Sequence, residues 1–542
     1  MKPRHRAKRE WWHVPARLRA VPGAFMRLPW VAVVVIMVAA GAAGGAVLLK
    51  DHYQAPAAQA LSPSPSPSPS PTPSPTPSPS PSPSPSPSPT AAPAAAAQPA
   101  RVAPAAPPNL TKPPEPQSLI DRLRPTLART TACLVVRSGE EETVSYNADL
   151  PLAPASTQKI LVAAAALDRL GPDYRFVTRV VARQGPTDGA VDEVWLVGGG
   201  DPVLSAPEWA AYELAQPRTA GAAVTPMAAL VDGMAGAGVK AVRGAVHGDD
   251  TWHDRLRYLP SWKSVYITDG DAVPLSGLTV NGGWKSWTPE GKPAENPTLY
   301  AASELARLLG GRGISVGGAD EGVAPPGAVV LASVSSPPLS AIVAFMLNSS
   351  DNLSAELITR ELGKRVLGTG STAEGTRVIT QEAAKLGLPT RGMQMIDGSG
   401  LDVGNRATCM LLQKTLDLGA EAPFRSMWDG LAVAGRTGTL VHRLIATPLE
   451  GRLHAKTGSI DGVVAFVGWI DGPRPIHFAF IANGTIPSAR QLGDDVLLAI
   501  ASDGGVAYVH EPAAPVLALA PAPTRPGRSA RAAPAAPAAR VA

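Results

Sequence analysis

Three short motifs place serine and lysine side chains in an order that could form a hydrolytic site without histidine. They are Ser156-Thr157-Gln158-Lys159, Ser350-Asp351-Asn352 and Lys456-Thr457-Gly458. A serine hydroxyl is a weak nucleophile near neutral pH and needs a neighbouring base. Residues three positions apart on a helix share one face, so Lys159 would stand beside Ser156. The motifs therefore predict acyl transfer through a serine ester.

Lys159 can accept a proton only when it is neutral, which requires burial and a nearby positive charge to lower its pKa. Lys456 is the candidate for that charge. Ser156 is expected in the first turn of a helix that follows Pro154 and contains the apolar run from Ile160 to Leu167. The positive end of this helix and its free amides suit the stabilisation of an oxyanion.

Each motif is weak evidence by itself. Roughly one Ser-x-x-Lys match is expected by chance in this composition, and Lys-Thr-Gly is expected about a tenth of a time. Ser350-Asp351-Asn352 could also be a polar turn that caps a helix over Leu353 to Leu362, because these residue types favour helix starts. The ordered combination of the three motifs is what indicates a site.

The elements around the third motif can be predicted from its apolar neighbours. Three segments are typical of successive buried strands: Leu453 to Ile460, Val463 to Ile470 and Ile476 to Ile481. A helix is expected over about Ala489 to Ala501. His454 shares a strand face with Lys456, but the motif leaves it no chemical task, so we expect a structural histidine.

With these motifs in order, the chain resembles the penicillin-binding proteins, specifically the low-molecular-mass class C group of D-alanyl-D-alanine carboxypeptidases and endopeptidases. Three further segments are similar to signatures of that group: Gly198-Gly199-Gly200-Asp201-Pro202-Val203-Leu204, Asp397-Gly398-Ser399-Gly400-Leu401 and Gly435-Arg436-Thr437-Gly438-Thr439-Leu440. The resemblance covers about residues 115 to 510. From the residues alone, the first two of these segments are expected to be structural turns.

The resemblance implies roles for four residues of the first two motifs. Ser156 would attack the carbonyl between two D-alanines, and Lys159 would accept its proton. Ser350 would relay a proton toward the leaving amine, and Asn352 would hold the amide of the substrate. Water would then hydrolyse the ester.

The third motif would bind the peptide. Lys456 and Thr457 would hold the terminal carboxylate, and Gly458 and Ser459 of the same strand would also bind the substrate. The backbone amides of Ser156 and Ser459 would form the oxyanion hole. β-Lactam antibiotics would mimic the peptide and leave a slowly hydrolysed covalent adduct.

The resemblance also implies an α/β fold, a serine β-lactamase/DD-transpeptidase-like domain with helices packed on an antiparallel sheet. Ser156 and Ser350 are 194 residues apart, whereas simple serine β-lactamases and compact carboxypeptidases have a much shorter gap. A domain typically takes ~100 to 150 residues. We therefore expect residues 115–180 and 336–510 to form the transpeptidase-like domain, interrupted by an inserted domain at 181–335. Its Gly-rich and β-branched segments predict a β-rich insert.

Four aromatic residues gather within the predicted insert, in a chain where aromatics are sparse. They are Trp252, Tyr258, Trp262 and Tyr266. In the group that the chain resembles, comparable regions help to form the pocket for the peptide stem. Ordinary core packing is the other interpretation, and we favour it.

The start of the chain predicts a membrane anchor. Residues 1–29 contain eight Lys or Arg and one acidic residue, Glu10, and an uncharged apolar run follows from Trp30 to Leu49. At 1.5 Å per residue this run reaches about 30 Å, which spans a bilayer, and its basic flank should stay in the cytoplasm. A cleaved signal peptide, which would give a secreted protein, is the alternative.

A stalk is expected at residues 50–114. Proline alternates with Ser or Thr from Ser62 to Thr90, which forbids helix and ladder pairing and favours polyproline II. At ~3.1 Å per residue this tract could reach about 90 Å, which would carry the enzyme from the membrane toward peptidoglycan. The Ala/Pro-rich tail, residues 511–542, is expected to be disordered, like the stalk.

The formal charge of +5 comes from the ends, because residues 1–29 and 511–542 are basic and the remainder is net acidic. We therefore expect no nucleic-acid partner. Cys133 and Cys409 could pair outside the cytoplasm or stay apart, and the sequence does not decide between these. Without a zinc-type motif or a nucleotide-binding loop, we expect no metal and no cofactor.

The sequence thus predicts a membrane-tethered serine D-Ala-D-Ala carboxypeptidase, with endopeptidase activity on peptide cross-links left open. A serine β-lactamase is one alternative, which the extra domain argues against. A non-catalytic wall-binding scaffold is another, and the intact Ser156, Lys159 and Lys456 argue against it.

Overall fold

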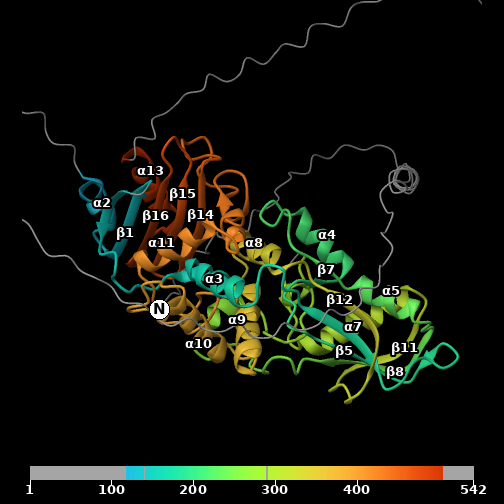
Figure 1. Cartoon of the computed structure of the whole chain (residues 1–542). Helices are drawn as coiled ribbons and strands as arrows, with labels where there is room; N and C mark the ends of the chain where they lie inside the picture. The colour runs from blue at the N-terminus through green and yellow to red at the C-terminus, as the bar shows by residue number, and fades with distance from the viewer. Residues whose placement is uncertain (1–117, 140, 289–290, 504–542) are drawn as a thin grey trace, which may run out of the picture. The chain divides into compact units, whose positions relative to one another are not determined.

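The computed structural model describes residues 118–503, except 140, 289 and 290 (Figure 1). The predicted basic head, membrane span, stalk and tail lie outside these residues. Within the described part of the chain, no helix is long and apolar enough to cross a bilayer.

A six-stranded antiparallel sheet joins the two ends of the described chain. Its strands are β1 (Thr130–Ser138), β2 (Glu141–Tyr146), β13 (Ala432–Val433), β14 (Leu453–Ile460), β15 (Val463–Ile470) and β16 (Ile476–Gly484). They run in the order β13-β14-β15-β16-β1-β2, so the first strand lies beside the last (Figure 1). The three predicted strands around the third motif are therefore confirmed.

Helices cover both faces of this sheet. Side chains alternate between the faces along each strand, so the apolar strands present buried residues on both sides. One face shares a core with α3 (Lys159–Arg169), α8 (Leu339–Ser349), α9 (Asn352–Leu367), α10 (Thr372–Lys385) and α11 (Cys409–Asp417). The other packs against α2 (Leu119–Leu127) and α13 (Ala489–Asp503), the predicted final helix. The short helix α12 (Arg425–Asp429) joins the first core. The predicted helices on an antiparallel sheet are confirmed.

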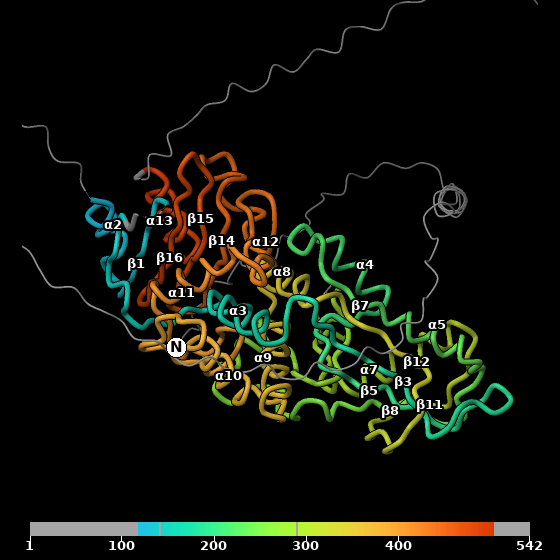
Figure 2. The backbone as a smooth tube through the Cα atoms, in the orientation of Figure 1, coloured from blue at the N-terminus to red at the C-terminus, as the bar shows by residue number. Residues whose placement is uncertain are grey.

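A second six-stranded sheet is built entirely from residues 177–335. Its strands are β3 (Val177–Ala182), β4 (Ala190–Val191), β5 (Val194–Val197), β8 (Ala241–Asp249), β11 (Ser315–Glu321) and β12 (Val329–Ser335). The order is β11-β8-β5-β3-β12, with β4 beside β8. In Figure 2 these strands carry the teal to yellow colours of the middle of the chain.

This segment also contains four helices, which the prediction of a β-rich insert did not include. The helices are α4 (Pro207–Ala215), α5 (Ala228–Gly236), α6 (Ser264–Thr268) and α7 (Pro297–Gly311). Strands β8 and β11 are parallel, and a parallel pair needs a crossover connection, which contains α7. Leu305 and Leu309 of α7 are buried at helical spacing. The remaining strands are two-stranded pairs: β6 (Leu204–Ser205) with β7 (Thr225–Pro226), and β9 (Trp284–Ser286) with β10 (Lys292–Pro293).

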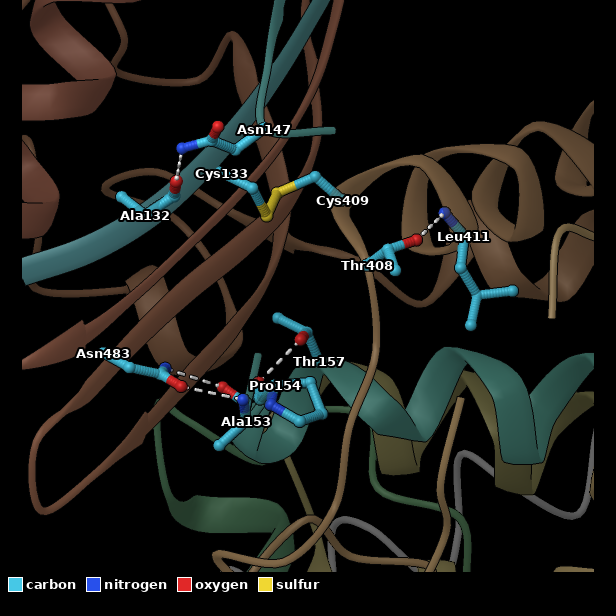
Figure 3. The surroundings of a disulfide bond; sticks show 10 residues. All are labelled: Ala132, Cys133, Asn147, Ala153, Pro154, Thr157, Thr408, Cys409, Leu411 and Asn483. Atoms are coloured by element: carbon cyan, nitrogen blue, oxygen red, sulfur yellow. Dashed lines mark hydrogen bonds between the residues drawn. A yellow bond between two sulfur atoms is a disulfide. The ribbon is translucent and has the colours of Figure 1, made fainter. Parts of the chain in front are cut away.

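A disulfide joins Cys133 of β1 to Cys409 at the start of α11, and both residues are fully buried (Figure 3). It resolves the pairing that the sequence left open. Asn483 of β16 fixes the chain nearby: the Ala153 amide donates to its Oδ1 at 2.8 Å, and its Nδ2 donates to the Ala153 carbonyl at 3.0 Å. The segment that leads to Ser156 is therefore anchored to the sheet.

Candidate active site

Ser156 lies in a 3-10 turn, η1 (Ala155–Gln158), that runs directly into α3. Its neighbours Ala155 and Thr157 are buried, whereas Ser156 is partly exposed. Ala155 has φ +48, a conformation that costs energy in residues other than glycine and often occurs at functional sites. The predicted place of Ser156 in the first helical turn is confirmed, with tighter 3-10 geometry.

The Lys159 side chain is fully buried and its amine is surrounded by three oxygen atoms. Nζ lies 3.0 Å from Ser156 Oγ, 2.7 Å from Asn352 Oδ1 and 2.6 Å from the Ser399 carbonyl oxygen. The predicted contact between the first serine and its lysine is thus present in the folded chain. Asn352 and Ser399 bring two other segments to the same amine.

Burial lowers the pKa of Lys159 to about 8, although the carboxylates of Asp397, Asp351 and Glu356 act in the opposite direction. Arg218 is a cation that lowers this pKa further, and the expectation that Lys456 supplies such a charge stays a prediction. Burial also lowers the pKa of Lys456, as do the nearby charges of Lys159 and Arg218. A buried, desolvated amine does not hold a proton well enough to act as a fixed cation.

The second motif caps a helix and also contacts the two lysines. Asp351 caps α9, because its side chain accepts a hydrogen bond from the Ser354 amide. Ser350 ends α8 in a left-handed conformation with φ +63. Asn352 accepts from Lys159 and donates through Nδ2 to the Asp271 carbonyl at 2.8 Å. The turn is a helix cap whose outer residues reach the lysines.

Lys456 is fully buried on β14 and lies close to the second motif. Its Nζ donates to Ser350 Oγ at 2.8 Å and to the Thr457 carbonyl at 2.6 Å. Lys159 contacts Asn352 while Lys456 contacts Ser350, so the three motifs meet in one cluster. All five predicted catalytic residues belong to it.

The remaining residues of the third motif line the adjoining part of β14. Thr457 Oγ1 donates to Thr439 Oγ1 at 2.9 Å, and Ser459 is exposed. Gly458 packs against the η1 turn that carries Ser156: a Cβ atom on Gly458 would lie 2.8 Å from the Pro154 carbonyl and 3.2 Å from the Ser156 amide. Strand β13 pairs with β14 only at His454 and Ala455, so the β14 edge beyond these has no strand partner within the described chain.

His454 and the aromatic cluster stay out of the group of catalytic candidates. His454 Nε2 lies 2.8 Å from Asp471 Oδ2, and its ring stacks on Trp469. Trp262 is buried and donates to Asp397 Oδ2 at 2.9 Å, and Tyr266 is buried in the same apolar cluster. Core packing is therefore the role of these two aromatics, as we favoured.

Sequence reasoning missed four groups that touch or influence the site: the Ser399 carbonyl, the Asp271 carbonyl, Thr439 and Arg218. Ser399 and Thr439 belong to segments that had been noticed as signatures. Arg218 donates to the Ser349 carbonyl at 2.6 Å and follows α4, where nothing in the sequence distinguishes it. In the part of the chain that the structure describes, no group of three or more His, Cys, Asp or Glu side chains could hold a metal ion.

Comparison with known proteins agrees with this geometry. The model of the D-Ala-D-Ala carboxypeptidase 3 (S13) family matches residues 118–294 and 286–502. A carboxypeptidase of Mycobacterium tuberculosis is 34% identical over 373 residues, which cover 64% of this chain and 74% of that protein. A D-alanyl-D-alanine carboxypeptidase of an Actinomadura species is 30% identical over 446 residues, which cover 67% of this chain and 80% of that protein.

The fold also matches a solved structure. Penicillin binding protein 4 of Haemophilus influenzae superposes with a TM-score of 0.60 at 19% identity, covering 71% of this chain and 98% of that one. The same protein has been solved in complex with a β-lactam, with a TM-score of 0.55. The family match extends over nearly all described residues and includes both buried lysines. The chain belongs to the D-Ala-D-Ala carboxypeptidase 3 (S13) family of serine peptidases.

Proposed function

We propose that the five clustered residues, Ser156, Lys159, Ser350, Asn352 and Lys456, carry out the carboxypeptidase reaction of this family. The observation that supports this best is the set of contacts around Lys159 Nζ. Asn352 Nδ2 faces the Asp271 carbonyl, which can only accept, so the Asn352 oxygen must face Lys159. The Ser399 carbonyl also only accepts. A neutral amine has two N–H groups, which these two oxygens use, and its lone pair is left facing Ser156 Oγ.

The reaction begins when Ser156 Oγ attacks the carbonyl carbon between the two D-alanines while Lys159 takes its proton. With a pKa of about 8, roughly a tenth of Lys159 is neutral at pH 7, which is enough for a base. The C–N bond then breaks, and the leaving amine of the terminal D-alanine takes a proton through the Ser350 hydroxyl. Water hydrolyses the ester and restores Ser156.

Lys456 is the group that we assign to the terminal carboxylate, together with Thr457. An anion beside a buried amine favours its charged form, so substrate binding would raise the pKa of Lys456. The resulting ammonium keeps its hydrogen bond to Ser350 Oγ. Ser350 releases its hydroxyl proton to the leaving amine and regains the proton that Lys159 took from Ser156. Lys456 would thus be a cation when the substrate is present, rather than a permanent one.

The unpaired edge of β14 is the proposed binding strand for the peptide. An extended substrate could add to this edge through main-chain hydrogen bonds beside Thr457 and Ser459. The close approach of Gly458 to the Ser156 amide brings the nucleophile next to that strand. The amides of Ser156 and Ser459 are then candidates for the oxyanion hole.

Penicillins and related β-lactams are expected to acylate Ser156. In a β-lactam the leaving nitrogen remains tethered to the acyl group after ring opening, which slows attack by water on the ester. The solved relative in complex with a β-lactam supports this proposal. Cleavage of peptide cross-links, an endopeptidase reaction, uses the same chemistry on an amine that belongs to another stem.

We further propose an extracytoplasmic enzyme held at the membrane by residues 30–49, or secreted if that segment is cleaved. The buried Cys133–Cys409 disulfide supports an oxidising compartment. We treat residues 181–335 as an inserted domain, because all of the second sheet except the first part of β3, together with its helices, comes from this part of the chain.

The activity is tested with a synthetic stem pentapeptide that ends in D-Ala-D-Ala. Release of free D-alanine by the wild-type protein, and none by Ser156→Ala, is the expected result. A cross-linked stem dimer in a parallel assay measures the endopeptidase reaction. D-alanine release that persists in Ser156→Ala would contradict the proposal.

A further inference from the structure

A buried glutamate lies one helical turn below the residue that contacts the catalytic lysine. Glu356 follows Asn352 by four positions on α9 and is 1% exposed. Its Oε1 accepts hydrogen bonds from the amides of Gly398, at 2.9 Å, and Ser399, at 2.7 Å. Its Oε2 is buried and has no hydrogen-bond partner among the described residues. A buried carboxyl group is costly, so this position needs an explanation.

The turn that Glu356 holds lies between α9 and the nucleophile. A Cβ atom on Gly398 would lie 2.1 Å from Thr359 Oγ1 of α9, and one on Gly400 would lie 2.1 Å from the Ala155 carbonyl. Only glycine permits contact this close on both sides. The turn is therefore packed between α9 and the Ala155–Ser156 segment, and a shift of α9 would move that segment as well.

Asp397 builds this turn from within, because its side chain accepts from the Gly400 amide and the Asp402 amide, each at 2.8 Å. Glu356 is therefore not needed to form the turn. What it adds is a link between the turn and α9, the helix that also carries Asn352. The two oxygens that orient Lys159, from Asn352 and Ser399, are thus connected through Glu356.

We propose that Glu356 is a positioning residue for acylation, which ties the Ser399 carbonyl to α9 so that Lys159 keeps its lone pair toward Ser156. This rests on the proposed function of Ser156 and Lys159. Glu356 touches no reacting atom. It acts through the Gly398 and Ser399 amides, and through its charge.

The charge of Glu356 should be visible in the pH dependence. Burial and, to a smaller extent, the Asp397 carboxylate raise the pKa of Glu356 to about 7, while the hydrogen bonds from Ser399 and the charge of Arg360 oppose this. Once ionised, Glu356 raises the pKa of Lys159. As pH rises, the carboxylate forms and makes Lys159 hold its proton more tightly. The acid limb of the acylation rate is therefore expected to be broad in the wild-type protein.

The test compares Glu356→Gln and Glu356→Ala in the full chain, with Glu382→Gln as the control. Glu382 is also a buried helical glutamate with charged partners, Arg169 and Lys385, but belongs to α10. The measurement is the rate of Ser156 acylation by penicillin from pH 5 to 9. Thermal unfolding of each variant monitors the fold.

Gln keeps an oxygen for the two amides but removes the charge. We expect Glu356→Gln to retain the plateau rate of acylation. The rise of the rate with pH should be steeper than in the wild type, and its midpoint should lie at a pH lower by about half a unit or more. Glu356→Ala should lose about tenfold or more at all pH values, because the turn is no longer tied to α9. The Glu382→Gln profile should match the wild type.

A Glu356→Gln profile that coincides with the wild type would overturn the proposal, and this variant decides the matter if Glu356→Ala does not fold. A folded Glu356→Ala protein with the wild-type rate would overturn it as well. If the wild-type protein itself is not acylated at Ser156, the proposed function fails instead, so the two failures are distinguishable.

Discussion

The Nζ atom of Lys159 lies 3.0 Å from Ser156 Oγ, and both of its other contacts are carbonyl-type oxygens that can only accept. This arrangement fixes the direction of the lone pair of the neutral amine. A lysine with freely rotating hydrogens could point any of them at the serine. Here Asn352 and Ser399 accept the two hydrogens, so the lone pair faces Ser156 Oγ, as the proposed role of Lys159 as base requires.

Replacement of Lys159 separates its charge from its basicity. Arginine keeps a positive charge but does not lose its proton in proteins, so Lys159→Arg should be as inactive as Lys159→Met. We expect both to lose about 10²- to 10⁴-fold in the rate of penicillin acylation, the range for loss of a general base. Acylation reactions that are quenched at successive times and analysed by mass spectrometry of the protein give these rates. Substantial acylation in Lys159→Arg would show that the base lies elsewhere.

Arg218 should set the pH at which acylation becomes fast. Its positive charge lowers the pKa of Lys159, so its removal raises that pKa and moves the acid limb to higher pH. In the wild type, the rate should rise through about pH 8. Arg218→Gln is expected to shift the limb upward by about half a pH unit. Arg218→Lys is the matched control that keeps the charge, and a limb shifted equally in both variants would contradict this explanation.

Gly400 should not tolerate a side chain. It has φ +85, and a Cβ atom there would lie 2.1 Å from the Ala155 carbonyl. Gly387 is the matched control, because it also has positive φ, +71, but a Cβ would meet nothing within 4 Å. We expect Gly387→Ala to cost only about 1 kcal/mol of unfolding free energy. Gly400→Ala should cost more and also slow acylation, measured by denaturant titration and penicillin labelling. Equal effects of the two changes would argue against the contact.

The Cys133–Cys409 disulfide closes a chain separation of 276 residues and links the sheet to α11. Constraint of so long a loop in the unfolded state predicts a loss of about 2 to 4 kcal/mol in Cys133→Ala/Cys409→Ala. Guanidinium titration with and without reductant measures it. Reductant should destabilise the wild type and leave the double variant unchanged. A wild-type protein that is insensitive to full reduction would contradict this role.

Local patterns in the sequence predicted most of the sheet that carries the third motif. The strands over Leu453 to Ile470 and the helix from Ala489 have a strong periodicity that survives in the fold. The helix that contains Lys159 and the helix cap at Asp351 were likewise predicted from nearby residues. These features depend on side chains close together in the chain.

What could not be predicted depends on segments that meet only in the folded chain. Arg218 reaches the site from the middle segment, and Ser399 arrives 240 residues after Lys159. The pairing of Cys133 with Cys409 could not be predicted from the sequence, because two isolated cysteines have no spacing pattern that indicates a disulfide. The high content of glycine and β-branched residues in residues 181–335 suggested strands, and helices such as α7 were therefore missed. The helical spacing of the buried residues Leu305 and Leu309 indicates α7, but amino-acid content carries no information on spacing.

The central claim is that Ser156 is the nucleophile of a site in which two buried lysines serve different steps. The most direct measurement is incubation of the full chain with labelled penicillin, followed by mass spectrometry of the digested protein. We predict one adduct, on Ser156, that is absent from Ser156→Ala. A label on any other residue, or none on the folded wild-type protein, would contradict the account.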